Sequence, residues 1–491
     1  MSFEPLSDIL LISLHPEHAA RIYLGEKKAE LRKTFPGSTK IVFVYETAPV
    51  SALTGAFWVK QAIRTSVQEA ITLASAGGVG VASAEKYYEG HEYGWVIQIG
   101  NVVKFKRPLQ LIELKSRNHY FAIPQTFLYL KRSEGLTQEL MHTLQMEWQS
   151  ALQLKPLSDA NKGYFEELVT STVGGAYEDI DRDFLDQVLD RRVGSQAAFS
   201  TREKSVLEML WGNELIGFTV LTEKVYGGWK SGPTALLPQY RGLGFGQSIR
   251  RLIEEYCVRR GAIGIYCTCA ESQPATVSYL LNNGMRFQAR LGEHLARGRA
   301  ELVFAKKLKR RRAIRVAPPT LSTNLPSMGR VVRIRSSHQK LDDVLDLFLR
   351  QMAAWYFKPK PGLRKAIRDS LLSKELGTTL YSAKCRSLYA CLDKSGTPQM
   401  AALLTEKRSQ MLKINLVAAV RSSALIKALL SKALKEMAPY RRVYLTVPAR
   451  EMAAIQVLEH MGFSFEGILE DPFGAGANHI CYGLIPGKPN R

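Results

Sequence analysis

A glycine-rich segment near the middle of the chain, Leu236–Gly246, has the residue types needed to hold a diphosphate. Its glycines at positions 242, 244 and 246 allow the backbone to approach phosphate oxygens closely, because no Cβ stands in the way. The segment is predicted to run from a strand into a helix, whose first turn would direct N–H groups and the positive end of its dipole at the anion. Dinucleotide sites, mononucleotide sites and structural turns share this pattern, so the glycines alone leave the ligand open.

The position of this turn among the predicted elements narrows its interpretation. It follows the fourth strand of a mainly antiparallel meander rather than the first strand of a βαβ unit, which argues against a dinucleotide-binding fold. The block 151–308, with its Arg-x-x-Gly-x-Gly pattern, resembles the GNAT superfamily of acyl-CoA-dependent N-acyltransferases. The resemblance implies that backbone groups of the turn bind the CoA pyrophosphate, and that those at the strand end receive the pantetheine arm and polarise the thioester carbonyl. The donor-binding residues so assigned are Leu236, Leu237, Arg241, Gly242, Leu243, Gly244, Phe245 and Gly246.

The candidate catalytic residues follow from the reaction that this resemblance implies. An acceptor amine that attacks the thioester of acetyl-CoA, or of another acyl-CoA, needs a base for its ammonium proton and an acid for the leaving thiolate. In many GNAT members the acid is the tyrosine of an Asn-x-x-Ala-x-x-x-Tyr pattern, which the segment Ser272–Tyr279 matches with Ser in place of Asn. Tyr279 is therefore the candidate acid, and packing of its helix against the sheet is the alternative. Glu208 and Glu223, on a predicted central hairpin, are the candidate bases.

A third block, 331–491, repeats the predicted element order of the second, which indicates an internal repeat. Its equivalent turn, Arg421–Ile426, keeps the arginine but has no glycine, and Leu458 stands at the position of the tyrosine. Bulkier side chains in the turn should obstruct phosphates. We therefore predict a degenerate GNAT-like copy that binds CoA poorly and has a structural or substrate-clamping role, with an unrelated α/β domain as the alternative.

Near the N-terminus, the segment Gly25–Arg32 has the form Gly-x-Lys-x-x-Glu-x-Arg. Lys27, Glu30 and Arg32 would place an ammonium, a carboxylate and a guanidinium in one cleft, a set that can hold a phosphate and hydrogen-bond a base edge. With the strand and helix before it, the motif resembles the ASCH domain, a PUA-like β-barrel associated with RNA. Some ASCH proteins are amidohydrolases that use a Lys and a Thr of this motif. Here Glu30 stands where the Thr would be, so we expect RNA binding rather than hydrolysis.

These motifs predict an α/β (α+β) protein in which a PUA-like β-barrel precedes two GNAT-type mixed-sheet domains. The predicted divisions are an ASCH domain at 1–130, a GNAT domain at 151–308, a basic proline-containing linker at 309–330 and the degenerate copy at 331–491. The elements expected to position the motifs are strands Ile9–Leu14, Glu214–Lys224 and Gly232–Pro238 and helices Asp179–Arg192, Gln247–Arg260 and Pro274–Asn282.

The composition indicates which kinds of partner and which cellular compartment are expected. The chain has 491 residues, with 67 Lys and Arg against 45 Asp and Glu, a formal charge of +22 that favours a nucleic acid or another polyanion as a partner. No run approaches the roughly 20 apolar residues of a membrane span, and the N-terminus does not have the pattern of a signal peptide. The six cysteines have no metal-ligand spacing, so we expect buried thiols, no metal and a cytoplasmic protein.

The sequence thus favours an N-acyltransferase, with acetyl-CoA or another acyl-CoA as donor, that acts on an amine of, or attached to, an RNA such as a tRNA. In this interpretation the ASCH region reads the RNA. Two alternatives stay open: an N-acetyltransferase for a protein or small amine, and a nucleic-acid-binding protein in which the GNAT folds are scaffolds. The sequence makes no prediction of oligomeric state.

Overall fold

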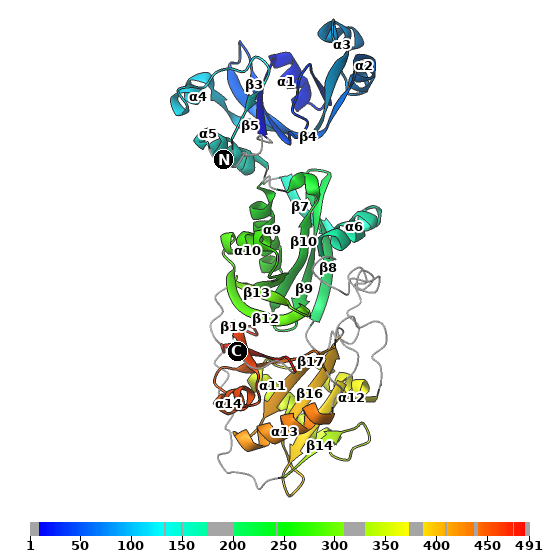
Figure 1. The fold of residues 1–491 in the computed structure, drawn as a ribbon, viewed down its shortest axis with the longest axis vertical. Helices are drawn as coiled ribbons and strands as arrows, with labels where there is room; N and C mark the ends of the chain where they lie inside the picture. The colour runs from blue at the N-terminus through cyan, green and yellow to red at the C-terminus, as the bar shows by residue number, and fades with distance from the viewer. Residues whose placement is uncertain are drawn as a thin grey trace. The chain divides into compact units, whose positions relative to one another are not determined.

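The chain forms two compact units in the computed structural model. The first comprises residues 1–153, 210–216 and 237–249, and the second comprises 154–209, 217–236 and 250–491. Figure 1 shows the ribbon coloured from the N-terminus to the C-terminus. The structure describes residues 9–131, 134–148, 151–173, 201–241, 244–308, 329–372, 386–407, 410–436, 440–474 and 476–486.

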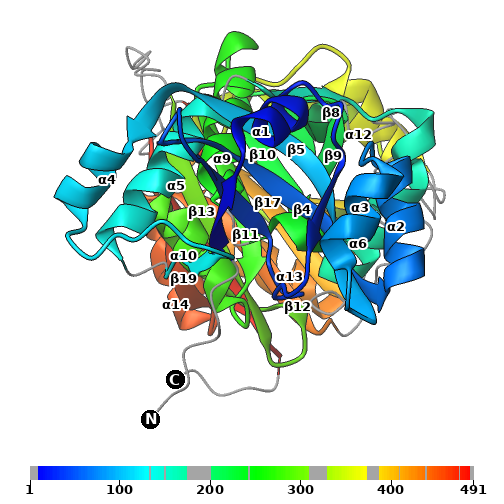
Figure 2. The same ribbon diagram turned by 90° about the horizontal axis from the view of Figure 1, so that it is seen from above.

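The first unit is built on a six-stranded sheet in the order β2-β5-β4-β3-β1-β6. Strand β1 reads Ile-Leu-Leu-Ile-Ser-Leu and pairs in parallel with β3; both are buried almost throughout, as near-continuous apolar strands of a covered sheet usually are. Two views place α2 and α3 at the opposite end of this unit from α4 and α5 (Figures 1 and 2). Its elements are β1 (Ile9–Leu14), α1 (Pro16–Tyr23), β2 (Ala29–Arg32), β3 (Ile41–Glu46), β4 (Ala52–Ser66), α2 (Val67–Ala76), α3 (Val81–Tyr88), β5 (Tyr93–Gln110), α4 (Leu111–Arg117), β6 (Leu128–Tyr129) and α5 (Gly135–Trp148).

The central copy of the repeat begins with a strand, a short helical segment and an antiparallel hairpin. The hairpin turns at Gly212, whose φ of 60° is readily adopted by glycine. Its elements are β7 (Leu152–Pro156), the 3-10 helix η2 (Asp159–Asn161), α6 (Lys162–Val173), β8 (Thr201–Trp211), β9 (Glu214–Lys224), β10 (Gly228–Leu236), the 3-10 helix η3 (Pro238–Tyr240), α9 (Phe245–Arg259), β11 (Gly264–Ala270), α10 (Pro274–Asn282), β12 (Arg286–Ala296) and β13 (Arg299–Lys307).

The C-terminal copy has its own large core, in which apolar side chains of the sheet pack against its helices. The buried stripe of α11, for example, includes Val344, Leu345, Phe348 and Met352, the spacing expected of one helical face. Its elements are β14 (Arg330–Ile334), α11 (Leu341–Trp355), α12 (Leu363–Leu372), β15 (Arg386–Leu392), β16 (Pro398–Lys407), β17 (Met411–Ala418), α13 (Ser423–Glu436), β18 (Arg442–Pro448), α14 (Met452–His460), β19 (Ser464–Leu469) and β20 (His479–Leu484).

Strand order confirms that the two copies have the same fold. From the outer edge inward the central copy runs β7-β8-β9-β10-β11-β13-β12, and the C-terminal copy runs β14-β15-β16-β17-β18-β20-β19. One pair in each copy is parallel, β10 with β11 and β17 with β18. The two sheets become one where Ala289 on β12 pairs with Gly467 on β19. The mixed α/β class predicted from the sequence is therefore confirmed.

Arg442 reinforces this junction from the interior. It is fully buried, and its two terminal nitrogens bond the carboxylate of Glu466 at 2.6 and 2.5 Å. It also donates to the carbonyl of Gly292 on β12, whose own N–H donates to Glu466 at 2.9 Å. A buried pair of this kind would leave an uncompensated charge if one partner were removed, so loss of either side chain should destabilise the junction.

The strand that leads to the glycine turn differs from its prediction. We expected a strand over Gly232–Pro238, but β10 starts at Gly228, and its pairing with β9 slips between Ser231 and Thr234. Gly232 lies at that slip with φ of 136°. A Gly-Pro pair weakens a regular ladder but suits a bulge, so the residues that suggested a strand start instead mark an irregularity inside the strand.

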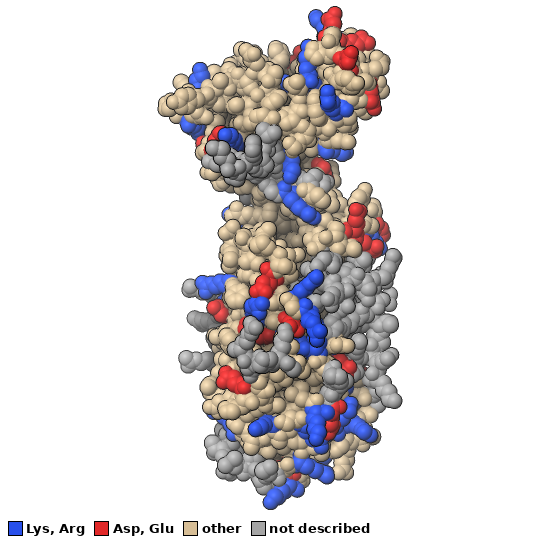
Figure 3. Space-filling model, viewed as in Figure 1, with Lys and Arg blue, Asp and Glu red and all other residues tan. Residues whose placement is uncertain are grey.

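Some predicted features lie outside the described residues. These are the helix expected over 179–192, nearly all of the linker 309–330, and Cys385. The other five cysteines are buried free thiols. On the face drawn in Figure 3, Lys and Arg side chains are interspersed with Asp and Glu, so the basic side chains of this face do not form one patch. Among the described helices, none is long and apolar enough to cross a membrane.

Candidate functional site

The predicted diphosphate cradle lies between β10 and α9. The Leu237 N–H donates to the carbonyl of Ile216 at 2.9 Å, and the Arg241 N–H closes η3 by donating to Pro238 at 3.2 Å. Gly244 follows with φ of 84°, a left-handed conformation that disfavours any side chain, and it is exposed. Gly242 and Leu243 lie outside the described residues. The turn therefore offers a diphosphate an exposed glycine at the first turn of α9, while the Leu237 and Arg241 N–H groups are already engaged.

The side chain of Phe245 anchors the start of α9 in the first unit. It is fully buried and stacks on Trp148 of α5, with ring centroids 4.2 Å apart and an interplanar angle of 13°. Trp211 and Trp58 complete the cluster, with centroids 5.4 and 6.0 Å from that of Phe245. Phe245 can therefore serve a donor only through its backbone, and its ring fixes the origin of the helix.

Gln145, one turn before Trp148 on α5, lies against the cradle. A Cβ added at Gly244 would collide with the side-chain amide of Gln145. That amide has N–H donors of its own. A diphosphate at Gly244 would therefore meet Gln145, which must either move aside or contribute a hydrogen bond.

Strands β10 and β11 diverge within the second unit. They pair only from Gly228–Gly264 to Lys230–Tyr266, and β10 then bulges. Arg250 of α9 is 3% exposed, and one of its terminal nitrogens donates to the Ser231 hydroxyl at 3.1 Å. The other, Nη2, has no hydrogen-bond partner among the residues that the structure describes. A buried cation with an unsatisfied donor suits a polar group inserted at this gap.

Arg250 was missed by the sequence analysis, although a weak signal for it exists. The buried face of α9 carries Phe245, Ile249, Ile253 and Cys257 at helical spacing. Arg250 adjoins that apolar stripe and is buried with it, its Nε donating to Glu254 at 2.9 Å. The sequence could have marked Arg250 as a charged residue beside an apolar helical stripe. It could not have predicted where the side chain points.

Tyr279 lies on α10, where the sequence placed it. Its ring packs against the buried cluster that includes Cys267, Cys269 and Phe304. Burial raises the pKa of Tyr279 to about 12, while the nearby Arg250 guanidinium acts in the opposite direction. The hydroxyl therefore stays protonated at neutral pH, as a general acid must, yet the packing also fits the structural alternative.

The two candidate bases are both engaged in local structure. Glu208 is buried on β8, and its Oε2 accepts from the Ser158 backbone and hydroxyl at 3.3 and 3.0 Å and from Asn161 at 2.8 Å. Glu223 is buried at the end of β9 and pairs with Arg202 at 2.6 Å. Glu208 thus ties η2 to the sheet. Neither contact singles out one carboxylate as the base, and both assignments stay predictions.

In the first unit the structure brings together all three residues of the N-terminal motif. Lys27 Nζ lies 2.5 Å from Glu30 Oε2, and Arg32 Nη2 lies 3.1 Å from Glu30 Oε1. Arg32 also donates to the carbonyls of Ser13 and Thr126, each at 3.3 Å. Lys27 and Glu30 are 7% and 5% exposed. One carboxylate thus bridges two cations, which leaves a net positive set.

In the part of the chain that the structure describes, no group of three or more His, Cys, Asp or Glu side chains is placed to hold an ion.

Comparison with known proteins gives one curated relative and several solved structures. No family model matches the chain. A curated relative, an ASCH domain-containing ribonuclease of Zymomonas mobilis, is 30% identical over 137 residues, which cover 27% of this chain and 88% of the relative. A crystal structure of ASCH from Zymomonas mobilis matches with 23% identity and a TM-score of 0.25, covering 27% of this chain and 94% of that one. A spermidine N-acetyltransferase of Vibrio cholerae, solved with CoA and spermine, matches with 17% identity and a TM-score of 0.28, covering 32% and 96%.

Proposed function

The chain belongs, through its N-terminal region, to the ASCH-domain family, and from that premise we propose that it is a cytoplasmic acyl-CoA-dependent N-acyltransferase whose acceptor amine is carried by an RNA such as a tRNA. In this proposal the central copy, 151–308, binds the donor and performs the transfer. The ASCH region, 1–130, holds the RNA. The C-terminal copy, 331–491, follows a linker at 309–330 and binds no CoA.

The observation that carries the donor half is the turn at Gly244. Its left-handed backbone, its exposure and its place at the start of α9 suit a diphosphate. The divergence of β10 from β11 and the unsatisfied Nη2 of Arg250 suit an acyl-pantetheine arm that continues from it. The Arg-x-x-Gly-x-Gly pattern and the backbone of Gly244 together support this proposal.

The acceptor half is supported by charge and by the N-terminal motif. Lys27, Glu30 and Arg32 present donors and one acceptor within a single contact network, which suits a phosphate beside a base edge. The formal charge of +22 favours a polyanion. An amine carried by an RNA could be bound through the ASCH region and acylated by the central copy.

In the proposed reaction the acceptor amine attacks the thioester carbonyl, and a new C–N bond replaces the C–S bond. Tyr279 gives its hydroxyl proton to the departing thiolate sulfur; burial, which raises the pKa of Tyr279 to about 12, keeps that hydroxyl protonated at neutral pH. Arg250 supplies a donor beside the acyl arm. Glu223 or Glu208, directly or through water, removes the proton that the amine loses.

Incubation of the purified protein with radiolabelled acetyl-CoA and total cellular RNA tests this function. We expect label in the RNA fraction, lost with Gly244→Trp and kept with Ala424→Trp, which makes the matching change in the C-terminal copy. Label in protein or in small amines instead would favour those acceptors. Measurable CoA binding with label in no fraction would overturn the RNA acceptor for acetyl-CoA, and absence of CoA binding would leave a nucleic-acid-binding scaffold.

A second function, RNA cleavage by the N-terminal region, is supported by the curated relative, which is named a ribonuclease. The contact of the Lys27 ammonium with the Glu30 carboxylate offers a cation and a potential base at one place. End-labelled RNA incubated without acyl-CoA would separate the two functions. Fragments that disappear with Lys27→Ala would support cleavage. Intact RNA that is still bound would leave RNA binding as the function of the N-terminal region.

A further inference from the structure

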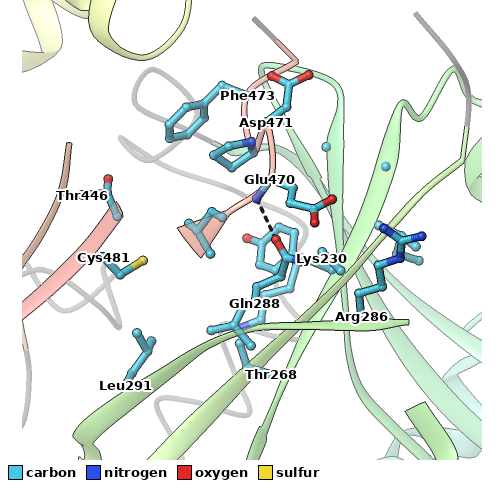
Figure 4. A pocket seen from close by; sticks show the side chains of 18 of the residues that line it. Lys230, Thr268, Arg286, Gln288, Leu291, Thr446, Glu470, Asp471, Phe473 and Cys481 are labelled. Carbon is cyan, nitrogen blue, oxygen red and sulfur yellow. Dashed lines mark hydrogen bonds between the residues drawn. The ribbon is translucent and has the colours of Figure 1, made fainter. Parts of the chain in front are cut away.

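A cavity of about 910 Å³ lies between the central and C-terminal copies, inside the second unit. One face of each sheet forms its wall. Figure 4 shows Thr268 and Leu291 of the central copy on one side and Thr446 and Cys481 of the C-terminal copy across from them, with the turn at Glu470 nearby. Cavities of roughly 300–1,000 Å³ are typical of small-molecule sites.

The two copies contribute the same chemical groups to this cavity. Lys230 on β10 pairs directly with Tyr266 on β11, and Lys413 on β17 pairs directly with Tyr444 on β18. All four line the cavity, although the copies differ in most other positions of these strands. Each tyrosine is followed two residues later by a threonine that also lines it; these are Thr268 and Thr446.

The preceding strands add a second pair of lysines. Each copy carries Leu-Thr-Glu-Lys, then five residues, then the cavity lysine, at 221–230 and 404–413. Thr222 pairs with Lys230, and Thr405 pairs with Lys413. Because side chains alternate along a strand, Lys224 and Lys407, two residues further on, project from the same face as the cavity lysines.

These lysines lie close enough to perturb one another. Burial first, and then the charges of Lys230, Lys413 and Lys204, lower the pKa of Lys224 to about 7. Burial, Lys413, Arg386 and Lys224 lower the pKa of Lys407 to about 7, and burial also lowers the pKa of Lys413. Gathering like charges in a partly dehydrated place opposes folding, and an anion bound among them would relieve that cost.

The acidic side chains of the cavity only partly offset this charge. Glu466 forms an ion pair with Arg442 at 2.5 Å. Glu301 lies 3.5 Å from His294, and burial lowers the pKa of His294 to about 4. Lys306 is paired with Glu254 outside the wall at 2.8 Å. The other charged lining residues are Arg286, Lys307, Glu470 and Asp471.

We propose that this cavity binds a phosphate-bearing nucleotide group. Its phosphate would lie among the two lysines and two threonines of the wall, and its base would lie against the two tyrosines. Lysines supply charge and threonine hydroxyls supply donors for phosphate oxygens. Tyr266 and Tyr444 offer aromatic surface. The group could be a free nucleotide or the terminal nucleotide of an RNA. The inference does not rest on acyl transfer, because none of these residues belongs to the glycine turn.

Calorimetric titration of the full-length protein with AMP, CMP, GMP and UMP tests the proposal, with adenosine and inorganic phosphate as partial probes. A short RNA with and without a 5′-phosphate forms the second arm. Binding of mononucleotides identifies a free-nucleotide site, and binding of only the phosphorylated RNA identifies an RNA end. Titrations at about pH 8 in two buffers of different ionisation enthalpy should register proton uptake, since lysines whose pKa is near 7 gain protons beside an anion.

The paired variant Lys230→Met with Lys413→Met should weaken this binding by at least about tenfold, the loss expected when charge-assisted hydrogen bonds are removed. Lys307→Met, at an exposed lining position, is the matched control and should change affinity little. Thermal unfolding checks that the paired variant folds. No binding of any probe by the folded wild-type protein, or equal affinity in the paired variant, would overturn the proposal.

Discussion

The central and C-terminal copies share one strand order but differ at the start of one helix. In the central copy, α9 follows the exposed, left-handed Gly244. In the C-terminal copy, α13 follows Ser422, whose hydroxyl accepts a hydrogen bond from the Leu425 N–H at 3.4 Å. A side chain of the chain itself thus caps the helix where the central copy keeps an open turn. At the same point of the fold, one helix thus begins at an exposed glycine and the other at a serine cap.

The difference extends to the helix that should carry the acid. Tyr279 on α10 is partly exposed, whereas Leu458 on α14 is fully buried in the C-terminal core. Yet the copies agree on the opposite face of the sheet, where Lys230 and Lys413 face one cavity. The exposed glycine turn and the tyrosine belong to the central copy, whereas both copies contribute a lysine to the cavity. The features proposed for donor binding therefore differ between the copies, and the cavity lysines do not.

The largest expected effect is on donor affinity. Gly244→Trp should abolish acyl-CoA binding, by about 100-fold or more, because the left-handed backbone strains any other residue and the indole would fill the cradle. The control is Ala424→Trp at the matching turn, which should leave affinity unchanged. Calorimetry with acetyl-CoA measures both. Two CoA molecules bound per chain, or equal loss in both variants, would break the distinction between the copies.

A smaller effect is expected on the chemical step. Tyr279→Phe should lower kcat by about 100-fold without changing donor affinity, since general acid catalysis contributes on that scale. In the wild type, kcat should not fall through loss of this proton until the pH approaches 12, because burial raises the pKa of Tyr279 to about 12. Leu458→Met in the C-terminal copy is the volume-matched control. An unchanged kcat in Tyr279→Phe would assign the ring to packing alone.

The second pair of lysines, Lys224 and Lys407, should make stability depend on pH. Lys224 and Lys407 have folded-state pKa values of about 7, below the usual value of lysine, so the unfolded chain binds more protons between about pH 7 and 10. The free energy of unfolding should therefore rise with pH across this window, by roughly 1 kcal/mol per pH unit for each lysine. Denaturation at several pH values measures it. Lys224→Met with Lys407→Met should flatten the slope, and an unaltered slope would contradict the pKa assignments.

The smallest effect is expected at the helix cap of the C-terminal copy. Ser422→Ala should lower the free energy of unfolding by about 0.5–1 kcal/mol, because one N–H at the start of α13 loses its acceptor. Acyl-CoA affinity should stay the same. Denaturant unfolding and calorimetry together test this, and a loss of affinity would mean that the C-terminal turn takes part in donor binding after all.

Local sequence signals predicted elements that short-range physics determines. The strands Ile9–Leu14 and Glu214–Lys224 and the helix Pro274–Asn282 have the expected bounds, because an apolar run, a two-residue turn and an N-terminal proline define them. The Lys27, Glu30 and Arg32 contact could also be foreseen, since the three lie within six residues.

Features that depend on long-range packing could not be predicted. The helix α5, Gly135–Trp148, was not foreseen, and its contact with Phe245 brings together residues about 100 positions apart. The approach of Lys224 to Lys413 likewise follows only from the junction of the two sheets. The start of β10 was predicted wrongly at Gly232, where the β9–β10 register shifts. Glycine and proline are typical of strand ends and of bulges alike.

Mass spectrometry of nucleosides from RNA incubated with the wild-type protein and isotopically heavy acetyl-CoA tests RNA acylation most directly. We expect one nucleoside, or one RNA-linked amine, that carries the heavy acetyl group with the wild type and with Ala424→Trp. That product should be absent with Gly244→Trp. Heavy acetyl absent from RNA while the wild type binds acetyl-CoA, or present at the same level with Gly244→Trp, would contradict the central claim.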